Sequence, residues 1–504
     1  MVYPKGLDLV LVNPGGRVRS YQSLGDTLAA VEPPVWAGML ATYVRHQRFT
    51  VRLLDANAEN LGVDEVVDRI GEMAPQLVAI VVYGHHPSAS TQVMPATGTL
   101  CRALKERQPH LKILLVGGHV AALPELTLRE EEADFVCGGE GPVTLVELLQ
   151  ALSSPRPDFA KVHDLWFFKG TEVCATAAAP LVLDLDDLMP GPAWDLLPME
   201  RYRAHNWHCF GYRDRQPYAA FYTSLGCPFR CTFCCIQAPF KRGEAALGYK
   251  AGVNSYRRWS PLTVLAQIDQ LVNEYGVRHL KLADEIFVLH RQHVKSICDL
   301  LIQRSYDLNI WAYARVDTLQ DPSLLEKLRR SGVRWLALGI EAANARVRDG
   351  VQKGYRQEDI FRTVNALRAA DINIIGNFIF GLPDDNLETM QETLQLGLDL
   401  NCEFANFYCT MAYPGSRLYE EARRQGWPLP ASWIGYSQLA VDTLPLPTRF
   451  LSGPEVLRFR DQAFQIYFNA PAYLEMISSR FGPETMEQIK EMTAHKIVRR
   501  YAED

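Results

Sequence analysis

The sequence predicts an α/β protein with three parts: an N-terminal Rossmann-like five-stranded parallel sheet, a central partial (β/α)6 TIM-like barrel, and a C-terminal helical region. Three observations predict it. Strand-length apolar runs alternate with helical patterns over residues 8–152, the alternation returns from residue 218, and residues 430–504 are helical and charged in pattern. The 504 residues, 48% hydrophobic and 22% charged, suit a soluble globular protein of two or three domains.

The first part alternates strands and helices in the order typical of a doubly wound sheet. Five such units in succession predict a parallel sheet with helices on both faces. Ligands of such sheets bind beyond the carboxyl ends of the strands. We expect strands at 8–13, 51–54, 77–83, 113–116 and 134–137, and helices over 34–47, 64–73, 91–107 and 143–152.

Glycine-rich segments follow three of these strands: Asn13-Pro-Gly-Gly16, Gly117-Gly-His119 and Gly138-Gly-Glu-Gly-Pro142. Glycine at a strand end lets a bulky ligand approach the backbone. Each segment taken alone is more often a simple turn. Together, on one rim, they predict a large cofactor, and none of them has the Gly-x-Gly-x-x-Gly pattern of dinucleotide binding.

Residues 153–215 are expected to form an irregular connection, because prolines interrupt every longer pattern. Its last segment, residues 202–212, holds His205, Trp207, His208 and Cys209. This segment could cover a substrate or could pack as part of a linker, and the sequence favours neither.

The central part has six further strands, too few to close an eight-stranded barrel, so we expect an open partial barrel. Ser260-Pro261 begins one of its helices and Gly276 ends it. Polar residues follow the strands, where barrel-like folds carry their active sites. The expected strands are 219–225, 277–283, 310–314, 335–340, 372–380 and 403–411, and the polar residues after them are Asp284, Glu285, Arg315, Glu341 and Asn377.

A loop after the first of these strands holds Cys227, Cys231 and Cys234 in the spacing Cys-x3-Cys-x2-Cys. Three thiolates can hold three irons of a four-iron four-sulfur (4Fe-4S) cluster, which normally takes four cysteines, so one iron stays open to another ligand. The alternative is a structural zinc site. Zinc requires four ligands, and no second Cys or His pair follows, although Cys235 and Cys209 are spare candidates.

The cysteine loop, with Phe233 before its third cysteine, resembles that of the radical S-adenosylmethionine (SAM) superfamily. The glycine-rich strand ends of the first part resemble the cobalamin-binding domain that precedes many radical SAM cores. The resemblance implies a 4Fe-4S cluster, SAM and cobalamin as cofactors. It places SAM at Phe233, Asp284, Glu285, Arg315, Glu341 and Asn377, and cobalamin at Asn13, Pro14, Gly15, Tyr83, Gly117, Gly118, His119, Gly139, Glu140 and Gly141.

One departure concerns the cobalt. Some cobalamin domains carry Asp-x-His-x-x-Gly, whose histidine binds the metal, and this chain has no histidine after its first strand. His85, His86 and His119 follow other strands and are taken as hydrogen-bonding loop residues. Cobalamin is therefore expected to bind without a protein histidine on cobalt.

The resemblance implies a cobalamin-dependent radical SAM enzyme that methylates an unactivated carbon of a small-molecule biosynthetic intermediate. A 5′-deoxyadenosyl radical would take a substrate hydrogen and methylcobalamin would supply the methyl group. No catalytic side chain is assigned. The alternatives are ring formation, rearrangement or oxidation without methyl transfer, and a non-catalytic cobalamin or iron-sulfur sensor. A methylthiotransferase is disfavoured, because it would need three more clustered cysteines and an RNA-binding module.

Charge and cysteine usage limit the partners. The net charge of −6 predicts no nucleic-acid partner, and the absence of a long apolar run predicts no membrane span. Eleven scattered cysteines favour the cytoplasm. An external one-electron reductant such as flavodoxin or ferredoxin is expected. Lys241-Arg242 and Arg257-Arg258 suggest an anionic substrate, although solvated charges, as also assumed for Lys353, are the default.

The expected domain boundaries follow from these patterns. They are 1–155 for the cobalamin-binding domain, 156–215 for the linker, 216–425 for the radical SAM barrel and 426–504 for the helical region.

Overall fold

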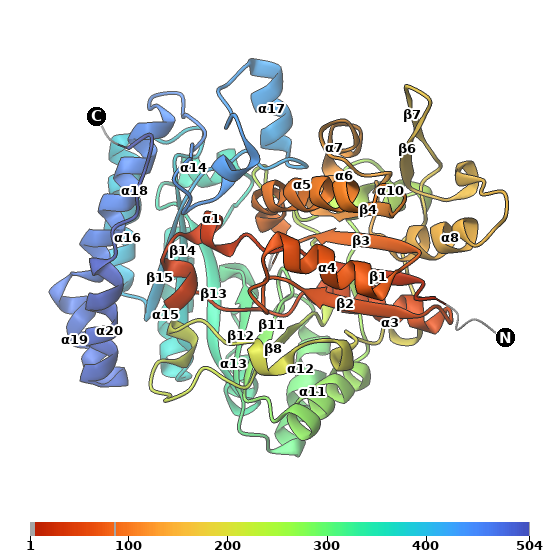
Figure 1. The fold of residues 1–504 in the computed structure, drawn as a ribbon. Coiled ribbons are helices and arrows are strands. Elements are labelled where there is room, and N and C mark those ends of the chain that lie inside the picture. The colour runs from red at the N-terminus through yellow and green to blue at the C-terminus, as the bar shows by residue number, and fades with distance from the viewer. Residues whose placement is uncertain (1–5, 85–86, 503–504) are drawn as a thin grey trace.

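The structure, a computed structural model, describes residues 6–84 and 87–502. Its N-terminal domain is built on a seven-stranded sheet in the order β2-β1-β3-β4-β5-β6-β7, whose first strands run across the view in Figure 1. Strands β1 to β5 are parallel, as the sequence predicts. They comprise Leu9–Asn13, Val51–Asp55, Leu77–Val82, Lys112–Gly117 and Phe135–Cys137.

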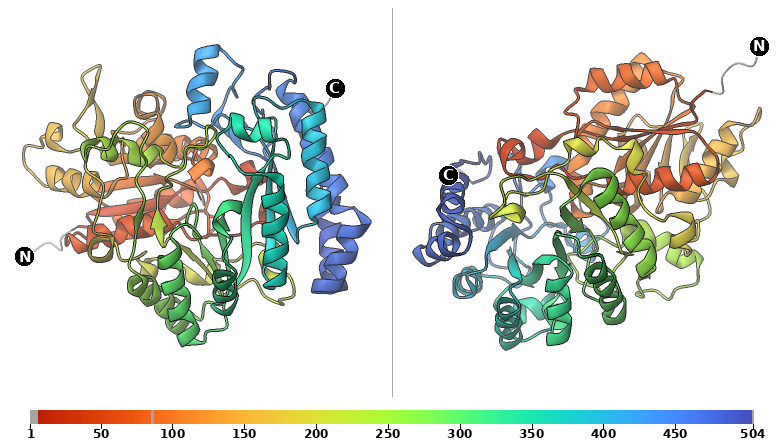
Figure 2. Two further views of the ribbon diagram at one scale, coloured as in Figure 1. Left: turned by 180° about the vertical axis from the view of Figure 1, so that it is seen from behind. Right: turned by 90° about the horizontal axis from the view of Figure 1, so that it is seen from below.

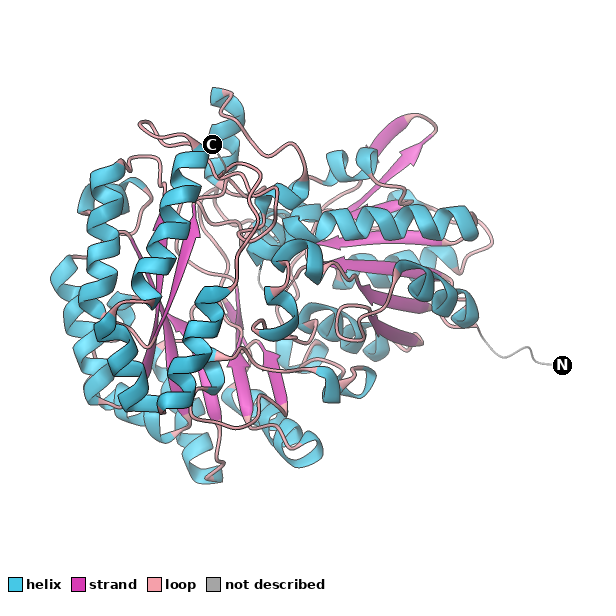
Figure 3. Ribbon diagram, turned by 60° about the vertical axis from the view of Figure 1, so that its left-hand side comes forward, coloured by secondary structure: helices cyan, strands magenta, loops and turns pink. Residues whose placement is uncertain are grey.

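Helices cover both faces of this sheet (Figure 3). Leu9 and Leu11 belong to one hydrophobic core and Val10 and Val12 to the other, because neighbouring side chains of a strand point to opposite faces. The first core contains side chains of α3 (Val35–His46) and α8 (Pro142–Leu152), and the second those of α4 (Val63–Met73) and α5 (Ser90–Arg107).

A hairpin extends the sheet beyond the five expected strands. Strands β6 (Leu165–Lys169) and β7 (Glu172–Ala175) add antiparallel to β5, with Gly170 in the left-handed conformation at the turn. The sequence predicted an irregular connection here. Strands of four or five residues that are half exposed leave only a weak periodic pattern, and pairing with β5 is what makes them strands.

The central domain is an open six-stranded parallel sheet in the order β15-β14-β13-β12-β11-β8. Its helices lie on the convex side, which is visible from below in Figure 2. Ser260 caps α11 by accepting from the Thr263 amide at 3.2 Å, and Gly276 ends the helix at φ 65°, as the sequence predicts. The strands are β8 (Tyr218–Phe221), β11 (His279–Leu282), β12 (Asn309–Ala314), β13 (Val333–Glu341), β14 (Asn373–Phe380) and β15 (Phe404–Cys409). The helices are α11 (Pro261–Tyr275), α12 (Arg291–Arg304), α13 (Pro322–Arg330), α15 (Gln357–Ala369) and α16 (Leu387–Leu400).

The C-terminal helices lie beside the open edge of the barrel. Helix α18 (Gly453–Phe468) packs along β15. Its Arg460 donates to the Phe407 carbonyl at 2.7 Å, and its Tyr467 donates to the Cys402 carbonyl at 2.6 Å. Helices α19 (Pro471–Phe481) and α20 (Pro483–Ala494) complete this layer, drawn in blue in Figure 1. The C-terminal region is therefore helical, as the sequence predicts, and it packs against the β15 edge of the barrel.

Short elements connect these parts. They are α1 (Arg17–Tyr21), α2 (Leu24–Thr27), α6 (Gly118–Ala122), α7 (Pro124–Glu130), α9 (Leu185–Leu188), β9 (Ser224–Leu225), α10 (Lys241–Ala246), β10 (Arg257–Arg258), α14 (Ala345–Gly350) and α17 (Arg417–Gln425).

Candidate active site between the two sheets

A cavity of about 980 Å³ lies where the N-terminal domain, the barrel and the C-terminal helices meet. Barrel side chains such as Asn377 line it, together with Tyr21 of the N-terminal domain and Arg460 of α18. A smaller cavity of about 100 Å³ lies at the carboxyl end of β1. Both cavities share the lining residues Tyr21, Ala29, Glu32, Ala89, Gln92 and His205, so they are two parts of one hollow region.

The cysteine loop begins at a position that only glycine fits. Gly226 has φ 84°, and a Cβ added there would lie 2.4 Å from the Ser255 carbonyl oxygen. Beyond it, the Cys227 amide donates to Gln237 Oε1 at 3.2 Å, and Asn254 Nδ2 donates to the Cys227 carbonyl at 2.8 Å. The loop is therefore fixed against residues 254–255 on a neighbouring segment.

A buried network behind the loop completes this support. Gln237 Nε2 donates to Glu244 Oε1 at 2.5 Å and to the Ser255 carbonyl at 3.2 Å, and the Ser255 amide donates back to Glu244 Oε1 at 2.7 Å. Neither Gln237 nor Glu244 is predicted by the sequence to support the site. Their importance comes from burial, which the sequence pattern of this loop does not reveal.

The thiols of this loop lie close together. Burial, followed by the thiols of Cys235, Cys231 and Cys227, raises the pKa of Cys234, and burial raises the pKa of Cys227 to about 12. The described residues contain no group of three His, Cys, Asp or Glu side chains placed to hold a single metal ion. Cysteines of a four-iron cluster bind separate irons and need not converge in that way.

Asp284 and Glu285, which follow β11, take different positions. Both oxygens of Asp284 are occupied: Oδ1 accepts from the Thr223 amide at 2.5 Å and Oδ2 accepts from the Ser224 hydroxyl at 2.8 Å. Asp284 thus holds the segment that leads into the cysteine loop. Glu285 lines the large cavity, and burial, with a smaller contribution from Asp284, raises its pKa to about 8.

Arg315, Glu341 and Lys353 lie on the cysteine-loop side of the barrel. The Arg315 guanidinium donates two hydrogen bonds of 2.9 Å to the Asp317 carboxylate. Its Cζ lies 3.7 Å from the centroid of the Phe229 ring. Glu341 occupies a bulge at φ 65° and accepts from Lys353 Nζ at 2.5 Å. Lys353 is therefore buried and paired, and not solvated as expected from the sequence. The Cys231 thiol interacts electrostatically with both the Lys353 and the Arg315 side chains.

Asn377 and Phe233 both line the large cavity. Asn377, on β14, accepts from Asn406 Nδ2 at 2.9 Å, which fixes the orientation of its amide. Phe233 packs its ring between two hydrophobic clusters beside Cys234. Of the six residues predicted for SAM, Phe233, Glu285 and Asn377 thus line the cavity, whereas Asp284, Arg315 and Glu341 do not.

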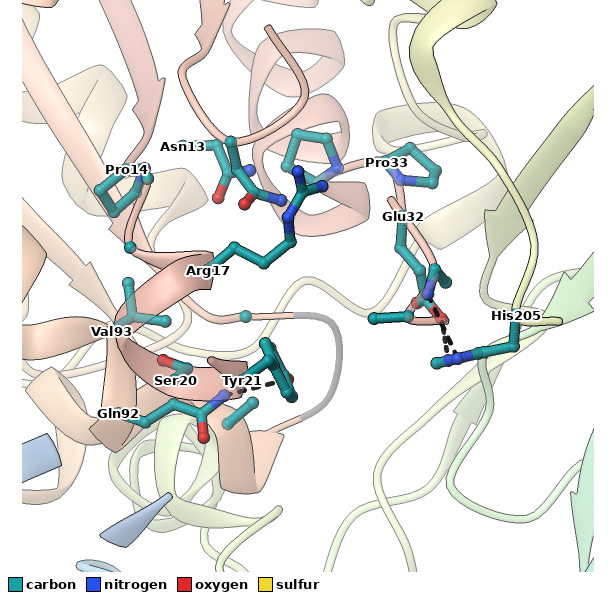
Figure 4. Close-up of a pocket in the computed structure, with 18 residues that line it drawn as sticks. Asn13, Pro14, Arg17, Ser20, Tyr21, Glu32, Pro33, Gln92, Val93 and His205 are labelled. Carbon is teal, nitrogen blue, oxygen red and sulfur yellow. Dashed lines mark hydrogen bonds and ion pairs between the residues drawn. The ribbon is translucent and has the colours of Figure 1, made fainter. Parts of the chain in front are cut away.

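Asn13, Pro14 and Gly15 line the smaller cavity. Asn13 Nδ2 donates to Asp55 at 2.7 Å, and burial raises the pKa of Asp55 to about 6. Figure 4 shows Asn13, Pro14 and Arg17 on one side of this cavity and His205 directed toward Glu32 on the other. This is the rim at which the sequence predicted a large cofactor.

The remaining predicted cobalamin residues lie at the carboxyl ends of β3, β4 and β5 but line neither cavity. A Cβ on Gly117 would lie 1.9 Å from the Val82 carbonyl oxygen, so this glycine allows close strand packing. His119 is 2% exposed, lies 3.2 Å from Thr91 Oγ1 and meets the Trp433 ring edge-on, and burial lowers its pKa to about 3. His119 is thus a hydrogen-bonding residue here, whereas His85 and His86 lie outside the described residues.

The other members of that set act in packing. Glu140 pairs with Arg257 at 2.7 Å and accepts from the Val182 amide at 2.6 Å. Tyr83 stacks on Trp36 with ring centroids 5.0 Å apart. Their contacts are within the protein, and their assignment to cobalamin stays a prediction. Gly118, Gly139 and Gly141 complete the set; a Cβ on Gly139 would lie 2.3 Å from Asp164, and one on Gly141 2.8 Å from Val116.

The segment 202–212 lies at the amino-terminal mouth of the barrel. Trp207 packs against Trp311 and Phe404, with ring centroids 5.3 Å and 5.7 Å away, and Asn309 donates to the His208 carbonyl at 2.7 Å. These contacts are with residues at the amino-terminal ends of the barrel strands. The segment therefore forms the floor of the cavity, not a roof over it.

The basic side chains of Lys241, Arg242 and Arg257 form ion pairs near the junction of the two domains. Lys241 pairs with Glu244 at 2.9 Å, Arg242 with Asp164 at 2.5 Å, and Arg257 with Glu140. None of these residues lines either cavity. The suggestion of an anionic substrate, which rested on these charges, loses its basis.

Comparison with known proteins decides the family. Residues 21–149 match the B12 binding domain and residues 221–397 match the Radical SAM superfamily. The anaerobic magnesium-protoporphyrin IX monomethyl ester cyclase of Rubrivivax gelatinosus is 30% identical over 411 residues, which cover 80% of this chain and 68% of the relative. The chain belongs to the cobalamin-binding radical SAM family.

Two other similar proteins agree with this chain in length or fold. An uncharacterized methyltransferase of Pyrococcus horikoshii is 28% identical over 408 residues, 81% of this chain and 82% of that protein. The methyltransferase TsrM of Kitasatospora setae, solved with cobalamin and a [4Fe-4S] cluster, matches in fold with a TM-score of 0.69 at 16% identity, over 97% of this chain and 100% of that one.

Membership confirms the expected radical SAM enzyme class and its cofactors: cobalamin, SAM and a 4Fe-4S cluster. The residues present fit these groups. Three neighbouring thiols beside buried cations suit an anionic cluster, and the continuous hollow at the glycine-rich rim leaves room for cobalamin beside it. No helix within the described ranges is long and apolar enough to span a bilayer.

Proposed function

We propose that this radical SAM enzyme transfers a methyl group to an unactivated carbon of a small molecule. The observation that carries the proposal is the shared cavity: Cys234 and Glu285 of the barrel line the same space as Tyr21 and Gln92 of the cobalamin domain. A substrate held there lies between both cofactor sites. When bound, the cluster with SAM supplies a carbon-centred radical and cobalamin supplies the methyl group, chemistry that no side chain provides for a C–H bond.

The side chains take supporting roles in this proposal. Cys227, Cys231 and Cys234 hold the cluster. Glu285 and Asn377, which line the cavity, bind the amino-acid and nucleoside parts of SAM, and Phe233 packs beside them. Asp284, Arg315 and Glu341 hold the surrounding loops in place. Asn13, Pro14 and Gly15 contact cobalamin, while Tyr83, Gly117, Gly118, His119, Gly139, Glu140 and Gly141 shape the strand ends behind it.

The C-terminal region excludes water from the cavity. Residues 493–497 line it, and Arg499 fixes this tail by donating to Asp461 at 3.0 Å and to the Gln438 carbonyl at 3.0 Å. Reactive intermediates are protected when water is kept out.

The deciding experiment is anaerobic reconstitution with iron, sulfide and hydroxocobalamin, followed by turnover with methyl-deuterated SAM and a strong reductant. We expect cluster and cobalamin absorbance, 5′-deoxyadenosine release, and deuterium in a product. The Cys231→Ala variant should keep cobalamin and lose 5′-deoxyadenosine. Cobalamin binding without SAM cleavage in the wild type would instead identify a sensor and refute the proposal.

A second reaction is favoured by one observation, the 30% identity to the Rubrivivax cyclase. Ring formation would use the same cavity and would also release 5′-deoxyadenosine. Its product would carry no deuterium from the labelled SAM methyl group. The same experiment therefore separates the two reactions.

The proposal includes the surroundings of the enzyme. We expect a small-molecule substrate, and a one-electron donor such as flavodoxin or ferredoxin, because cluster reduction needs an external electron source. A cytoplasmic location suits eleven free thiols. Replacing the chemical reductant with purified flavodoxin in the turnover experiment tests the donor.

A further inference from the structure

We propose that the α18 side of the large cavity binds a carboxylate group of the substrate, and that Arg460 is the cation that pairs with it. The proposal rests on the proposed function only in that the substrate must enter this cavity. It goes beyond that function by naming the chemical class of the bound group and its place in the cavity.

Arg460 has one donor left over for a ligand. The residue lines the cavity and is 7% exposed. Its Nε donates to the Phe407 carbonyl at 2.7 Å and its Nη1 to Asp461 at 2.6 Å, whereas its Nη2 has no hydrogen-bond partner among residues 6–84 and 87–502. Nη2 is not one of the unpaired polar atoms that the protein encloses completely, so a ligand can reach it.

Tyr408 gives a second donor beside it. This residue directly follows Phe407 on β15 and lines the cavity. Its hydroxyl likewise makes no hydrogen bond within the described part of the chain and is not completely enclosed. Burial raises the pKa of Tyr408 to about 12 and Arg460 lowers it, so the hydroxyl keeps its proton at neutral pH and lies within the field of the guanidinium.

The cluster around Arg460 carries one positive charge too many. Asp461 accepts from Arg460 and, through both oxygens, from Arg499 Nε and Nη2 at 3.0 Å. Arg499 is 4% exposed, and its other hydrogen bonds go to two main-chain carbonyls and the Thr443 hydroxyl, which are neutral. Two largely buried guanidiniums thus share one carboxylate. Because a buried charge without a partner is unfavourable, a monoanion bound here would stabilise the cluster.

The other carboxyl groups of the cavity lie toward β11 and do not cancel this charge. Glu32 accepts from Lys281 Nζ at 2.7 Å. Burial raises the pKa of Glu285 to about 8, so it is mostly protonated at neutral pH in the free enzyme. After burial and Tyr408, both carboxyl groups raise the pKa of Tyr313 on β12, which places them on that side of the cavity.

The opening of the cavity adds further positive charge. Lys496 lines the cavity and is exposed, and His495 lines it next to Lys496. Asp442, a carboxylate on the neighbouring loop, pairs with Arg500 at 2.8 Å. An anion that enters from this side is therefore attracted toward the α18 wall.

Charge and donors together select a carboxylate. Its two oxygens can accept from Arg460 Nη2 and from the Tyr408 hydroxyl, and hydrogen bonds between charged groups are stronger than those between neutral ones. A substrate held by its carboxylate at this wall can extend its body toward Cys234 and Glu285, which line the same cavity.

The test uses the reconstituted holoenzyme and two probes of the same shape, 2-naphthoate and 2-naphthamide, measured by equilibrium dialysis at neutral pH and low salt. The two probes differ in charge and share the flat body. Naphthoate should bind at least about tenfold more tightly than naphthamide, because it pairs with Arg460.

Three variants locate the effect. Arg460→Gln should bring naphthoate to the affinity of naphthamide. Tyr408→Phe removes one hydroxyl and no charge, so it should weaken naphthoate by about fivefold and keep part of the preference. Arg480→Gln is the matched control and should keep the full preference, since Arg480 lies on α19, pairs with Asp371 at 3.1 Å and does not line the cavity.

Cobalamin absorbance and the unfolding midpoint report whether each variant is folded. If Arg460→Gln does not fold, Tyr408→Phe decides, and unchanged naphthoate binding in that variant would overturn the inference. Equal affinity of the two probes in the wild type, or a preference that survives Arg460→Gln, would also overturn it.

Two further measurements separate the substrate from the cofactors. A change in cobalamin absorbance on adding naphthoate would place the carboxylate on cobalt. A fall in affinity for SAM or hydroxocobalamin in Arg460→Gln would assign this arginine to a cofactor. Either result overturns the inference. Methyl transfer is scored separately in the same preparations, and a carboxylate preference without methyl transfer would sink the proposed function and leave this inference standing.

Discussion

Glu285 is the residue whose protonation bears most directly on SAM binding. Burial, then the neighbouring Asp284, raises its pKa from the ordinary 4.5 to about 8, and Lys281 opposes this. A carboxyl group with a raised pKa is mostly protonated at neutral pH in the free enzyme. Folding then favours the proton-bound form, so this residue's contribution to stability is lost as pH rises from the ordinary pKa through about 8.

We predict that SAM binding to the reconstituted enzyme tightens as pH rises from about 6 to about 7.5, because the ammonium of SAM favours the Glu285 carboxylate. In Glu285→Gln the dependence should disappear and the affinity should stay low. Isothermal titration across this pH range measures it. Parallel pH curves for the wild type and the variant would show that another group controls binding.

Residue identity alone was enough to choose the candidate side chains but not their neighbours. The cysteine spacing and the polar residues after the barrel strands came from the sequence. That Lys353 is buried against Glu341, and that Asp284 has both oxygens occupied, depends on chain segments far apart in sequence. These contacts decide which residues line the cavity and which only hold it.

At the scale of elements, the loop that follows β9 is tightly constrained. Gly226 has a left-handed backbone, and a Cβ added there would lie 2.4 Å from the Ser255 carbonyl oxygen. The hydrogen bond from the Cys227 amide to Gln237 holds the next residue of the loop. A side chain at this position would push Ser255 away and move Cys227. The cluster needs all three thiols in register, so a local shift here affects iron binding.

We predict that Gly226→Ala lowers the iron content of the reconstituted enzyme and lowers its unfolding free energy by about 2 kcal/mol more than Gly248→Ala. Gly248 is the matched control because it has a similar φ of 76° but open space around its Cβ position. Iron analysis and thermal unfolding measure the two effects. Equal losses in both variants would mean that backbone strain, not the clash with Ser255, dominates.

Elements with strong periodicity were predicted within a few residues, such as α11 with its Ser260 cap and Gly276 end. The β6–β7 hairpin was missed because its strands are short and half exposed, and become strands only through pairing with β5. The sequence likewise did not decide the role of residues 202–212, because that role depends on contacts with distant strands. Nothing in its own sequence says which end of the barrel it meets.

At the scale of the molecule, buried ion pairs join the two domains, among them Lys281–Glu32 and Arg257–Glu140. Glu140 follows β5 and Arg257 lies on β10 beside the cysteine-loop strand; both side chains are 6% exposed. Arg257 also donates to the Val182 carbonyl at 2.6 Å. The pair therefore fixes the cobalamin domain relative to the loop that holds the cluster.

We predict that Glu140→Gln destabilises the protein by about 3 kcal/mol, because it leaves the Arg257 charge buried without a partner. Asp195→Asn, which breaks the exposed Arg45–Asp195 pair, should cost less than about 1 kcal/mol and serves as the control. Denaturant unfolding of both variants gives the comparison. A loss in Glu140→Gln no larger than in the control would show that the junction tolerates the uncompensated charge.

The sequence by itself determined the two sheets and the cysteine loop, because strand and helix periodicity and motif spacing are local properties of the chain, and the resemblance of its motifs to a known family indicated the cofactors. Only the tertiary structure decided that Glu285 and Asn377 share one cavity with Tyr21 and Gln92, that residues 202–212 form its floor, and that the basic loop is paired at the domain junction. The reason is physical: a cavity is defined by what several distant segments leave unfilled. Its shape and charge balance appear only when those segments are packed together.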